Sequence, residues 1–428
     1  MIRIHVSSRQ RNLIAGTLAL GLGLATVGSA AAQLPLRLPD LPPGLPRVID
    51  SAVGQVRATG DRVRGVVMAE MARARPDVLD LDDRGNLVVR DEIVALAPSA
   101  GLLARARAKG FVVGEDKPDD TLGVRLVVLR PPRGESARRA LKEIRALDPT
   151  GVFDLDHILL PSAAAEGSSE SVATPASDDD TRTRIGMIDG GVATNHPVFA
   201  TVRIEQRGFA GAVKAGPHGT AVASLLVGRG PGLPDGARST QLYAADVYGA
   251  SPAGGSALMI LAAMRWLATT RVGVVNVSLV GPNDATIKAG VTALMARGIL
   301  VVAPVGNEGP AAGPLYPASY DGVVAVTAID AKGRLLPEAG RAKHLDFAAP
   351  GVVLAAVPGG GFKKMRGTSF ASPQVAERLA RDLPRADPTG ARRAMEHLKR
   401  TAADLGAFEG GRLHGFGASP PSDATTRR

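Results

Sequence analysis

Four short segments in the second half of the chain contain side chains suited to nucleophilic catalysis. Asp189 ends an apolar run, and His218 stands in the segment Pro-His-Gly-Thr. Asn307 follows a second apolar run, and Ser369 stands in the segment Gly-Thr-Ser-Phe-Ala. A serine hydroxyl becomes a good nucleophile when an adjacent base removes its proton, and a histidine oriented by a carboxylate is such a base. The amide of an asparagine can donate a hydrogen bond to the oxyanion that such an attack creates.

Each of these residues also has an ordinary structural explanation when it is taken alone. An aspartate that closes a strand often forms a turn, and the same holds for an asparagine near glycine. A lone histidine is usually a surface or core residue, and a serine at the start of a helix is commonly its N-cap. The combination of all four is much more specific than any one of them.

The elements around these residues predict an α/β fold. From residue 184 onward, predicted strands and helices alternate, which indicates a largely parallel sheet with helices on both faces. In such folds, binding and catalytic sites collect at the carboxyl ends of the strands. Asp189 and Asn307 both stand at such ends. The predicted strands are 184–188, 240–247, 272–279, 299–303 and 323–329, and the predicted helices are 219–226, 256–269, 284–296 and 369–383.

The four segments resemble the signature sites of the subtilisin-like serine proteases, or subtilases, within residues 184–418. The resemblance includes the chain order Asp, His, Ser. It implies that Ser369 is the nucleophile and that His218 is the general base, which then protonates the leaving amine. It also implies that Asp189 orients His218, and that the Asn307 side chain and the Ser369 backbone N–H form the oxyanion hole. The implied activity is that of a serine endopeptidase that needs no cofactor for its chemistry.

Substrate contacts follow from the same resemblance. Ser278, Leu279 and Val280 resemble the family strand that pairs with an extended peptide, and Gly306 is expected beside the substrate. Pairing of this kind reads the peptide backbone, so broad specificity is expected. The alternative is an ordinary buried strand. Calcium is common in the family, but no residue spacing here predicts a metal site, so structural calcium stays open.

Several positions depart from the family pattern. Gly190 replaces a Thr or Ser that follows the family's Asp, which removes a hydroxyl near the carboxylate. Ala221 replaces a His, Phe370 replaces a Met, and Gln374 and Glu377 replace a His and a Gly. None of these changes removes a catalytic group. They leave open a slow enzyme or one with an altered active-site rim.

The first 32 residues are typical of an export signal. Arg3, Arg9 and Arg11 precede a charge-free stretch that ends in three alanines, with a cleavage site before Gln33. The alternative is an uncleaved membrane anchor, since twenty uncharged residues can span a bilayer. We expect export to the periplasm or the extracellular medium, with no stable membrane insertion after cleavage.

A small domain is predicted between the signal and the catalytic region. Residues 86–160 read as β-α-β-β-α-β, an α+β ferredoxin-like arrangement, and the family resemblance makes them a propeptide that assists folding and inhibits. A parallel α/β sheet folds slowly because its contacts are non-local, which gives such a helper a purpose. Residues 33–85 are a Pro-rich segment and a helical extension, with a helix within 48–75 for which the sequence indicates no role.

Residues 161–183 are predicted to be a linker that contains the maturation site, and residues 419–428 are predicted to be a flexible tail. The resemblance predicts that the end of the 86–160 domain lies in the substrate cleft and that the chain cleaves itself between Ser162 and Arg184. Cleavage of the Leu160–Pro161 bond is not expected, because proline has no N–H. The expected partners are polypeptide substrates and the chain's own propeptide.

Composition excludes several other functions. The chain has 428 residues, of which 45% are hydrophobic, so it can form a substantial core. It has no cysteine, and its 9 Phe, 4 Tyr and 1 Trp do not suit a platform for stacking single-stranded nucleic acid. The net charge of +10 comes from scattered Lys and Arg, so specific nucleic-acid binding is not expected. We expect a monomer. The alternative function is a peptide-binding pseudoprotease or a propeptide-locked protein without turnover.

Overall fold

The structure is a computed structural model, and the domains are described from the residues that it places. The predicted signal peptide, almost all of the linker and the predicted tail lie outside these residues. Within the described part of the chain, no helix is both long and apolar enough to cross a membrane. The described residues are 64–114, 116, 120–162, 182–230, 233, 240–408 and 411–415.

A five-stranded antiparallel sheet with two helices forms the first domain. Its strands run in the order β1-β2-β4-β3, and β5 pairs with the other edge of β2. Strands β5, β2, β4 and β3 therefore have the order of the predicted split β-α-β-β-α-β arrangement. The elements are β1 (Leu79–Leu81), β2 (Leu87–Leu96), α3 (Ala100–Ala108), β3 (Val112–Val113), β4 (Leu126–Arg130), α4 (Ala137–Leu147) and β5 (Val152–His157).

Two details of this domain differ from the prediction. The two short strands expected near residues 87–89 and 93–96 are one strand, β2. Its pairing with β5 shifts between Val88 and Ile93, and Asp91 has a φ of 58°, which is typical of a bulge. The helix expected within 48–75 covers residues 64–74 of the described chain. Its Met68 is 1% exposed and packs with Leu79, Leu87 and Ile158, so this helix belongs to the core of the first domain.

The second domain contains a nine-stranded sheet in the order β17-β18-β14-β13-β12-β10-β7-β9-β8. Every neighbouring pair is parallel except β17 and β18. The largely parallel sheet was predicted, and β7, β9, β10, β12 and β13 match the predicted strands. Bounds are β7 (Thr183–Asp189), β8 (Arg203–Gly208), β9 (Thr240–Asp246), β10 (Val274–Val277), β12 (Leu300–Pro304), β13 (Val324–Ile329), β14 (Phe347–Pro350), β17 (Ala403–Phe408) and β18 (Gly411–Gly415).

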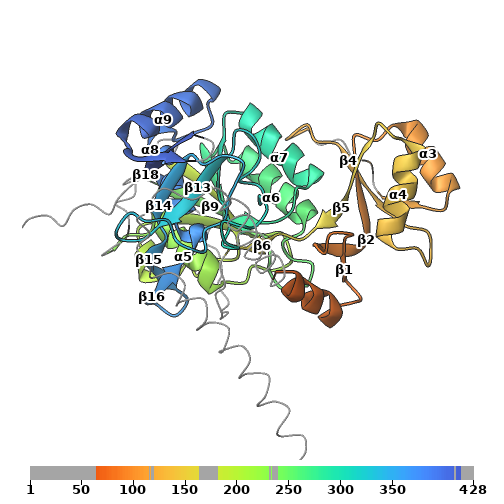
Figure 1. Cartoon of the computed structure of the whole chain (residues 1–428), viewed down its shortest axis with the longest axis horizontal. Coiled ribbons are helices and arrows are strands. Elements are labelled where there is room, and N and C mark those ends of the chain that lie inside the picture. The colour runs from red at the N-terminus through yellow and green to blue at the C-terminus, as the bar shows by residue number, and fades with distance from the viewer. Residues whose placement is uncertain are drawn as a thin grey trace, which may run out of the picture. The chain divides into compact units, whose positions relative to one another are not determined.

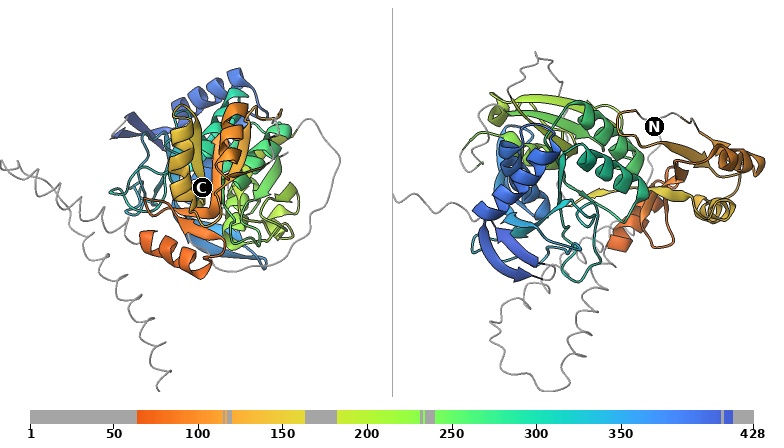
Figure 2. Two further views of the ribbon diagram at one scale, coloured as in Figure 1. Left: turned by 90° about the vertical axis from the view of Figure 1, so that its right-hand side faces the viewer. Right: turned by 90° about the horizontal axis from the view of Figure 1, so that it is seen from above.

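Helices cover both faces of this sheet (Figures 1 and 2). In β7, Ile185 and Met187 belong to the core under α5, α8 and α9, while Ile188 belongs to the core under α6 and α7. This alternation along one strand is what a sheet buried on both sides requires. The helices are α5 (Pro217–Val227), α6 (Ala257–Thr269), α7 (Ala285–Ala296), α8 (Ser372–Asp382) and α9 (Pro388–Thr401), and a hairpin is formed by β15 (Val352–Val357) and β16 (Gly361–Arg366).

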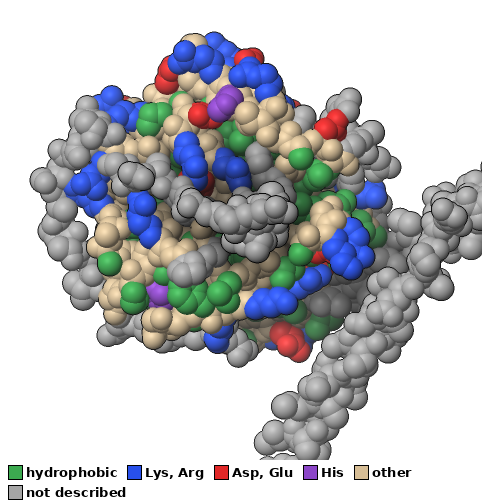
Figure 3. Space-filling model, turned by 90° about the vertical axis from the view of Figure 1, so that its left-hand side faces the viewer, with side chains coloured by type: hydrophobic (Ala, Val, Ile, Leu, Met, Phe, Trp, Pro, Cys, Tyr) green, Lys and Arg blue, Asp and Glu red, His purple; other side chains and the backbone are tan. Residues whose placement is uncertain are grey.

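The basic residues on one face of the described chain lie in separate groups (Figure 3). On the face that Figure 3 shows, Lys and Arg side chains are interspersed with neutral and hydrophobic ones. The densest group in the sequence, Lys363, Lys364 and Arg366, stands on β16. This distribution agrees with the scattered charge pattern in the sequence.

Candidate active site

Asp189 and His218 form a buried pair at the carboxyl edge of the sheet. Asp189 ends β7, and His218 is the second residue of α5. The ring nitrogen Nδ1 of His218 lies 2.9 Å from Asp189 Oδ1, and the two residues are 7% and 0% exposed. When Nδ1 donates to this carboxylate oxygen, the neutral ring keeps its lone pair on Nε2. Nε2 has no hydrogen-bond partner among the described residues and can therefore accept a proton.

Close backbone contact brings these two elements together. A Cβ atom on Gly219 would lie 2.2 Å from the Gly190 carbonyl oxygen and 2.7 Å from that of Gly191. Only glycine permits this approach of α5 to the end of β7, as the sequence predicts for the residue after His218. The contact fixes the histidine ring beside its carboxylate.

Ser369 lies in a short 3₁₀ helix, η2 (Thr368–Phe370), that precedes α8. The sequence predicts a single helix from Ser369 to Leu383, and this is wrong at its start because α8 begins at Ser372. Ser369 is fully buried, and its neighbour Phe370 packs on the His218 ring with the ring centroids 5.3 Å apart. The hydroxyl of Ser369 contacts the hydroxyl of Ser162, from the end of the first domain.

The side-chain oxygen of Asn307 is hydrogen-bonded to Thr368, the residue before Ser369. Asn307 Oδ1 accepts a hydrogen bond from the Thr368 backbone N–H at 2.9 Å. The adjacent Gly306 has a φ of 93°, and its carbonyl oxygen accepts a bond from the Thr368 hydroxyl at 3.1 Å. This φ is one that residues with a side chain rarely adopt, so the loop favours glycine there. Since Oδ1 is engaged, the Nδ2 group of Asn307 is the donor that can face a substrate.

The end of the first domain pairs with the predicted substrate strand. The strand expected at 272–279 is divided, and its second part is β11 (Leu279–Val280), which pairs antiparallel with β6 (Leu160–Pro161). The Ser162 backbone N–H lies 3.4 Å from the Ser278 carbonyl oxygen. The chain from β6 to Ser162 is therefore extended, and Ser162 contacts Ser369.

A second segment binds the other side of this extended chain, and sequence reasoning missed it. The Leu159 backbone N–H donates to the Gly255 carbonyl at 2.9 Å, and the Tyr248 hydroxyl donates to the Leu159 carbonyl at 3.0 Å. Leu159 is fully buried, and a Cβ on Gly281 would lie 2.6 Å from its Cγ. The Gly254-Gly255 pair was the available signal, because adjacent glycines often mark a close backbone approach.

The departures from the family pattern have structural roles. Gly190 places no hydroxyl near Asp189, and Asp189 Oδ2 has no partner among the described residues. Ala221 is fully buried in the core. The Gln374 amide donates to the Pro350 and Phe370 carbonyls, each at 2.7 Å, and the buried Glu377 pairs with Arg381 at 2.6 Å.

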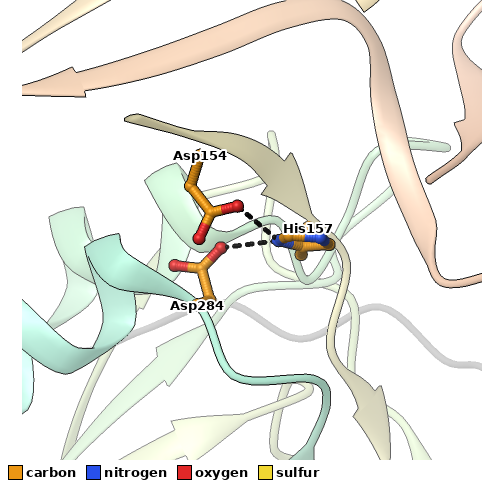
Figure 4. A group of neighbouring side chains, drawn as sticks. All are labelled: Asp154, His157 and Asp284. Atoms are coloured by element: carbon orange, nitrogen blue, oxygen red, sulfur yellow. Dashed lines mark hydrogen bonds and ion pairs between the residues drawn. The ribbon is translucent and has the colours of Figure 1, made fainter. Parts of the chain in front are cut away.

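One group away from this site has its polar atoms close enough to surround a metal ion. In the described part of the chain, ligand atoms of Asp154, His157 and Asp284 lie within 4.8 Å of one another (Figure 4). Both ring nitrogens of His157 already face carboxylates, so the group is an ion-pair cluster. It offers no support for structural calcium, which prefers oxygen ligands.

Comparison with known proteins agrees with this architecture. The chain is 34% identical to subtilisin Savinase of Lederbergia lenta over 254 residues, which covers 56% of this chain and 90% of that protein. It is also 34% identical over 254 residues to an alkaline protease of Shouchella clausii, covering 56% of this chain and 64% of that protein. A crystal structure of fervidolysin from Fervidobacterium pennivorans, a keratinolytic enzyme related to subtilisin, shares the fold with a TM-score of 0.62 at 19% identity, covering 79% of this chain and 61% of that one.

The family model of the subtilases matches residues 180–418, which is more than half of the chain. This range contains the Asp189–His218 pair, Asn307 and Ser369. The chain therefore belongs to the subtilase family of serine endopeptidases.

Proposed function

We propose that this protein is an exported serine endopeptidase made as a zymogen, in which Asp189, His218 and Ser369 form the catalytic triad. The observation that carries the proposal is the buried pair of His218 and Asp189, whose second ring nitrogen has no partner among the described residues. When Nδ1 donates to Asp189, that nitrogen keeps a lone pair that can accept the serine proton. Phe370, the residue after Ser369, packs on the same ring.

The reaction uses these groups in sequence. Ser369 Oγ attacks the carbonyl carbon of the scissile peptide bond, and His218 Nε2 takes the hydroxyl proton. Asp189 stabilises the resulting imidazolium, while the Asn307 side chain and the Ser369 backbone N–H donate to the oxyanion. Collapse breaks the C–N bond, and the proton on His218 passes to the departing amine. Water then hydrolyses the acyl-enzyme by the same steps.

Residues 86–160 act as an inhibitory propeptide in this proposal. Residues 159–162, at the end of this domain and the start of the linker, occupy the groove between β11 and the 248–255 segment in the manner of a substrate. Ser162 contacts Ser369, so the maturation bond is Ser162–Ala163, within the interval predicted from the sequence. The cleaved segment would remain bound as an inhibitor until it dissociates or is degraded.

The same contacts indicate what substrates fit. The groove engages the peptide mainly through backbone hydrogen bonds, which favours extended polypeptides of varied sequence. Leu159, three residues before Ser162, fills a buried site against Gly281. We therefore expect a preference for a leucine-like residue at the fourth position before the scissile bond.

Labelling with a fluorophosphonate tests the proposed chemistry. The processed wild-type protein should be labelled at Ser369. It should also hydrolyse a peptide substrate that has leucine at the fourth position before the scissile bond. The variants Ser369→Ala and His218→Ala should show neither property. Hydrolysis that persists in Ser369→Ala would refute the proposed nucleophile. A processed wild-type protein that neither labels nor hydrolyses peptides would instead support a peptide-binding pseudoprotease.

A further inference from the structure

His157 lies between carboxylates from three separate segments. Its Nδ1 is 2.9 Å from Asp284 Oδ2 and 3.8 Å from Asp154 Oδ1, and its Nε2 is 3.4 Å from Asp82 Oδ2. Figure 4 shows Asp154 and His157 extending from β5 toward Asp284, which stands at the start of α7. The cluster thus joins the first domain to the catalytic domain.

The N-terminus of α7 orients two of these carboxylates. Asp284 is the N-cap of α7 and accepts from the Ile287 backbone N–H at 2.9 Å. Asp154 Oδ2 accepts from the Ala285 backbone N–H at 3.0 Å. Each carboxylate therefore satisfies one free N–H of the helix and keeps its other oxygen for His157. Asp284 is buried and Asp154 is partly buried on the same side of the ring, so a positive charge on the ring offsets the repulsion between the two acids.

The hydrogen bonds favour a charged ring. Nδ1 faces Asp284 Oδ2 at 2.9 Å and Nε2 faces Asp82 Oδ2 at 3.4 Å, and a doubly protonated ring can donate to both oxygens. Burial alone would lower the pKa of His157, but its hydrogen bonds to Asp284 and Asp82 raise that pKa to about 10. Burial opposes ionisation of Asp82, yet hydrogen bonds from His157 and Asn86 lower its pKa to about 2. Histidine and carboxylate therefore stabilise each other's charged forms.

Several of the remaining charged groups around the cluster have other partners. A cavity of about 350 Å³ adjoins it, lined by residues from the β1–β2 turn, α4, β5 and the segment before α7. Across this cavity, Lys142 pairs with Asp83 at 3.1 Å, and Arg138 lies 3.9 Å from the same carboxylate. The Arg145 guanidinium donates to the Phe153 carbonyl at 2.9 Å. The other titratable groups facing the cluster are Arg84 on the turn and Tyr320, whose hydroxyl donates to the Asp284 carbonyl at 2.8 Å.

We propose that protonated His157 is an ionic clasp that holds the 86–160 domain on the N-terminus of α7, and that loss of its proton at alkaline pH loosens the domain. The regulatory meaning of this clasp rests on the proposed function, since it would then set the pH at which the inhibitory domain leaves the enzyme. The contact itself is independent of catalysis, so it can be tested in an inactive chain.

The sign of the pH effect follows from linkage. The pKa of His157 is about 10 in the docked state and near 6.5 when the ring is exposed. Its contribution to docking is therefore complete below about pH 6.5 and is lost as the pH rises toward 10. Burial also raises the pKa of Asp156, to about 7, and Asp156 accepts from the Leu258 backbone N–H at 3.0 Å at the start of α6. Its titration acts in the same direction and must be separated experimentally.

Hydrogen–deuterium exchange in the full chain provides this test. Every protein carries Ser369→Ala, so that it stays uncleaved if the proposed function is right. Exchange is followed at pH 6.5 and pH 9 in peptides covering 153–162 and 283–290, with a β7 peptide from the core as the reference for intrinsic rates. The further substitutions are His157→Gln, which is neutral, His157→Lys, which keeps a positive charge, and Asp156→Asn, which keeps an acceptor for Leu258.

We expect protection of the two test peptides to fall about tenfold or more from pH 6.5 to 9, relative to the reference. Asp156→Asn should retain most of this fall. His157→Gln should have low protection at both pH values, and His157→Lys should keep more protection than His157→Gln at pH 9. An unchanged pH dependence in His157→Gln would overturn the proposal. So would protection that rises with added zinc and falls with a chelator, because the cluster would then bind a metal ion in place of the proton.

Discussion

The molecule buries two histidines against carboxylates and uses them differently. His218 has Nδ1 bonded to Asp189, while its Nε2 has no partner among the described residues. His157 has a carboxylate facing each ring nitrogen. A histidine bonded on one side keeps a lone pair that can accept a proton, whereas one that faces a carboxylate on both sides is held as a cation until the pH becomes alkaline. The number of acidic partners, more than burial, separates a candidate base from a structural ion pair.

Among the variants that test this comparison, a change at Asp189 should cause the largest fall in kcat. In Asp189→Asn, the amide can hold His218 in the wrong tautomer, so kcat should fall by about 10⁴-fold. The measurement is the steady-state hydrolysis of a peptide by processed enzyme. The matched control is Asp382→Asn, because Asp382 also pairs with a histidine, His397, at 2.6 Å but on the surface. A similar loss in both variants would show that His–Asp pairing has a general structural effect.

Removing the oxyanion donor should have the next largest effect. Asn307→Leu keeps the approximate size of the side chain and removes the donor, so kcat should fall by about 10²- to 10³-fold with KM little changed. A loss that appears mainly in KM would assign Asn307 to ground-state binding. Circular dichroism would verify the fold, because Thr368 also loses its acceptor in this variant.

A third substitution would give the Asp189 carboxylate a second partner. A Cβ atom on Gly190 has open space, with its nearest neighbour, Tyr248 Cδ2, at 3.9 Å. Gly190→Ser can therefore place a hydroxyl near Asp189 Oδ2, and one added hydrogen bond of about 1 kcal/mol would raise kcat/KM by about fivefold. Gly190→Ala is the control without the hydroxyl. Equal activities for the Ser and Ala variants would show that the unpartnered oxygen does not limit the reaction.

The sequence predicted those features that depend on local patterns. The apolar run before Asp189, the alternation of strands and helices, and the Gly-Thr-Ser segment are local. Together they predicted the parallel sheet, with Asp189 and Asn307 at the carboxyl ends of its strands. Gly219 was predicted to allow close approach, and its contact with the Gly190 carbonyl confirms this.

Features that depend on distant contacts were missed. His157 is 75 residues from Asp82 and 127 residues from Asp284, and no local spacing relates them. The sequence predicted two short strands near residues 87–89 and 93–96. They form the single strand β2 with a bulge, because β2 pairs with β5 on both sides of the bulge. The 3₁₀ turn at Ser369 likewise depends on its packing against α5, which helix propensity does not describe.

The most direct test of the whole account is intact-mass analysis and N-terminal sequencing of wild-type protein beside Ser369→Ala. We predict that wild type yields a catalytic fragment that begins at Ala163, whereas Ser369→Ala stays joined to residues 86–160. Identical processing of the two proteins would contradict the account, because another protease would then remove the first domain. Retention of that domain in both would equally contradict self-processing by Ser369.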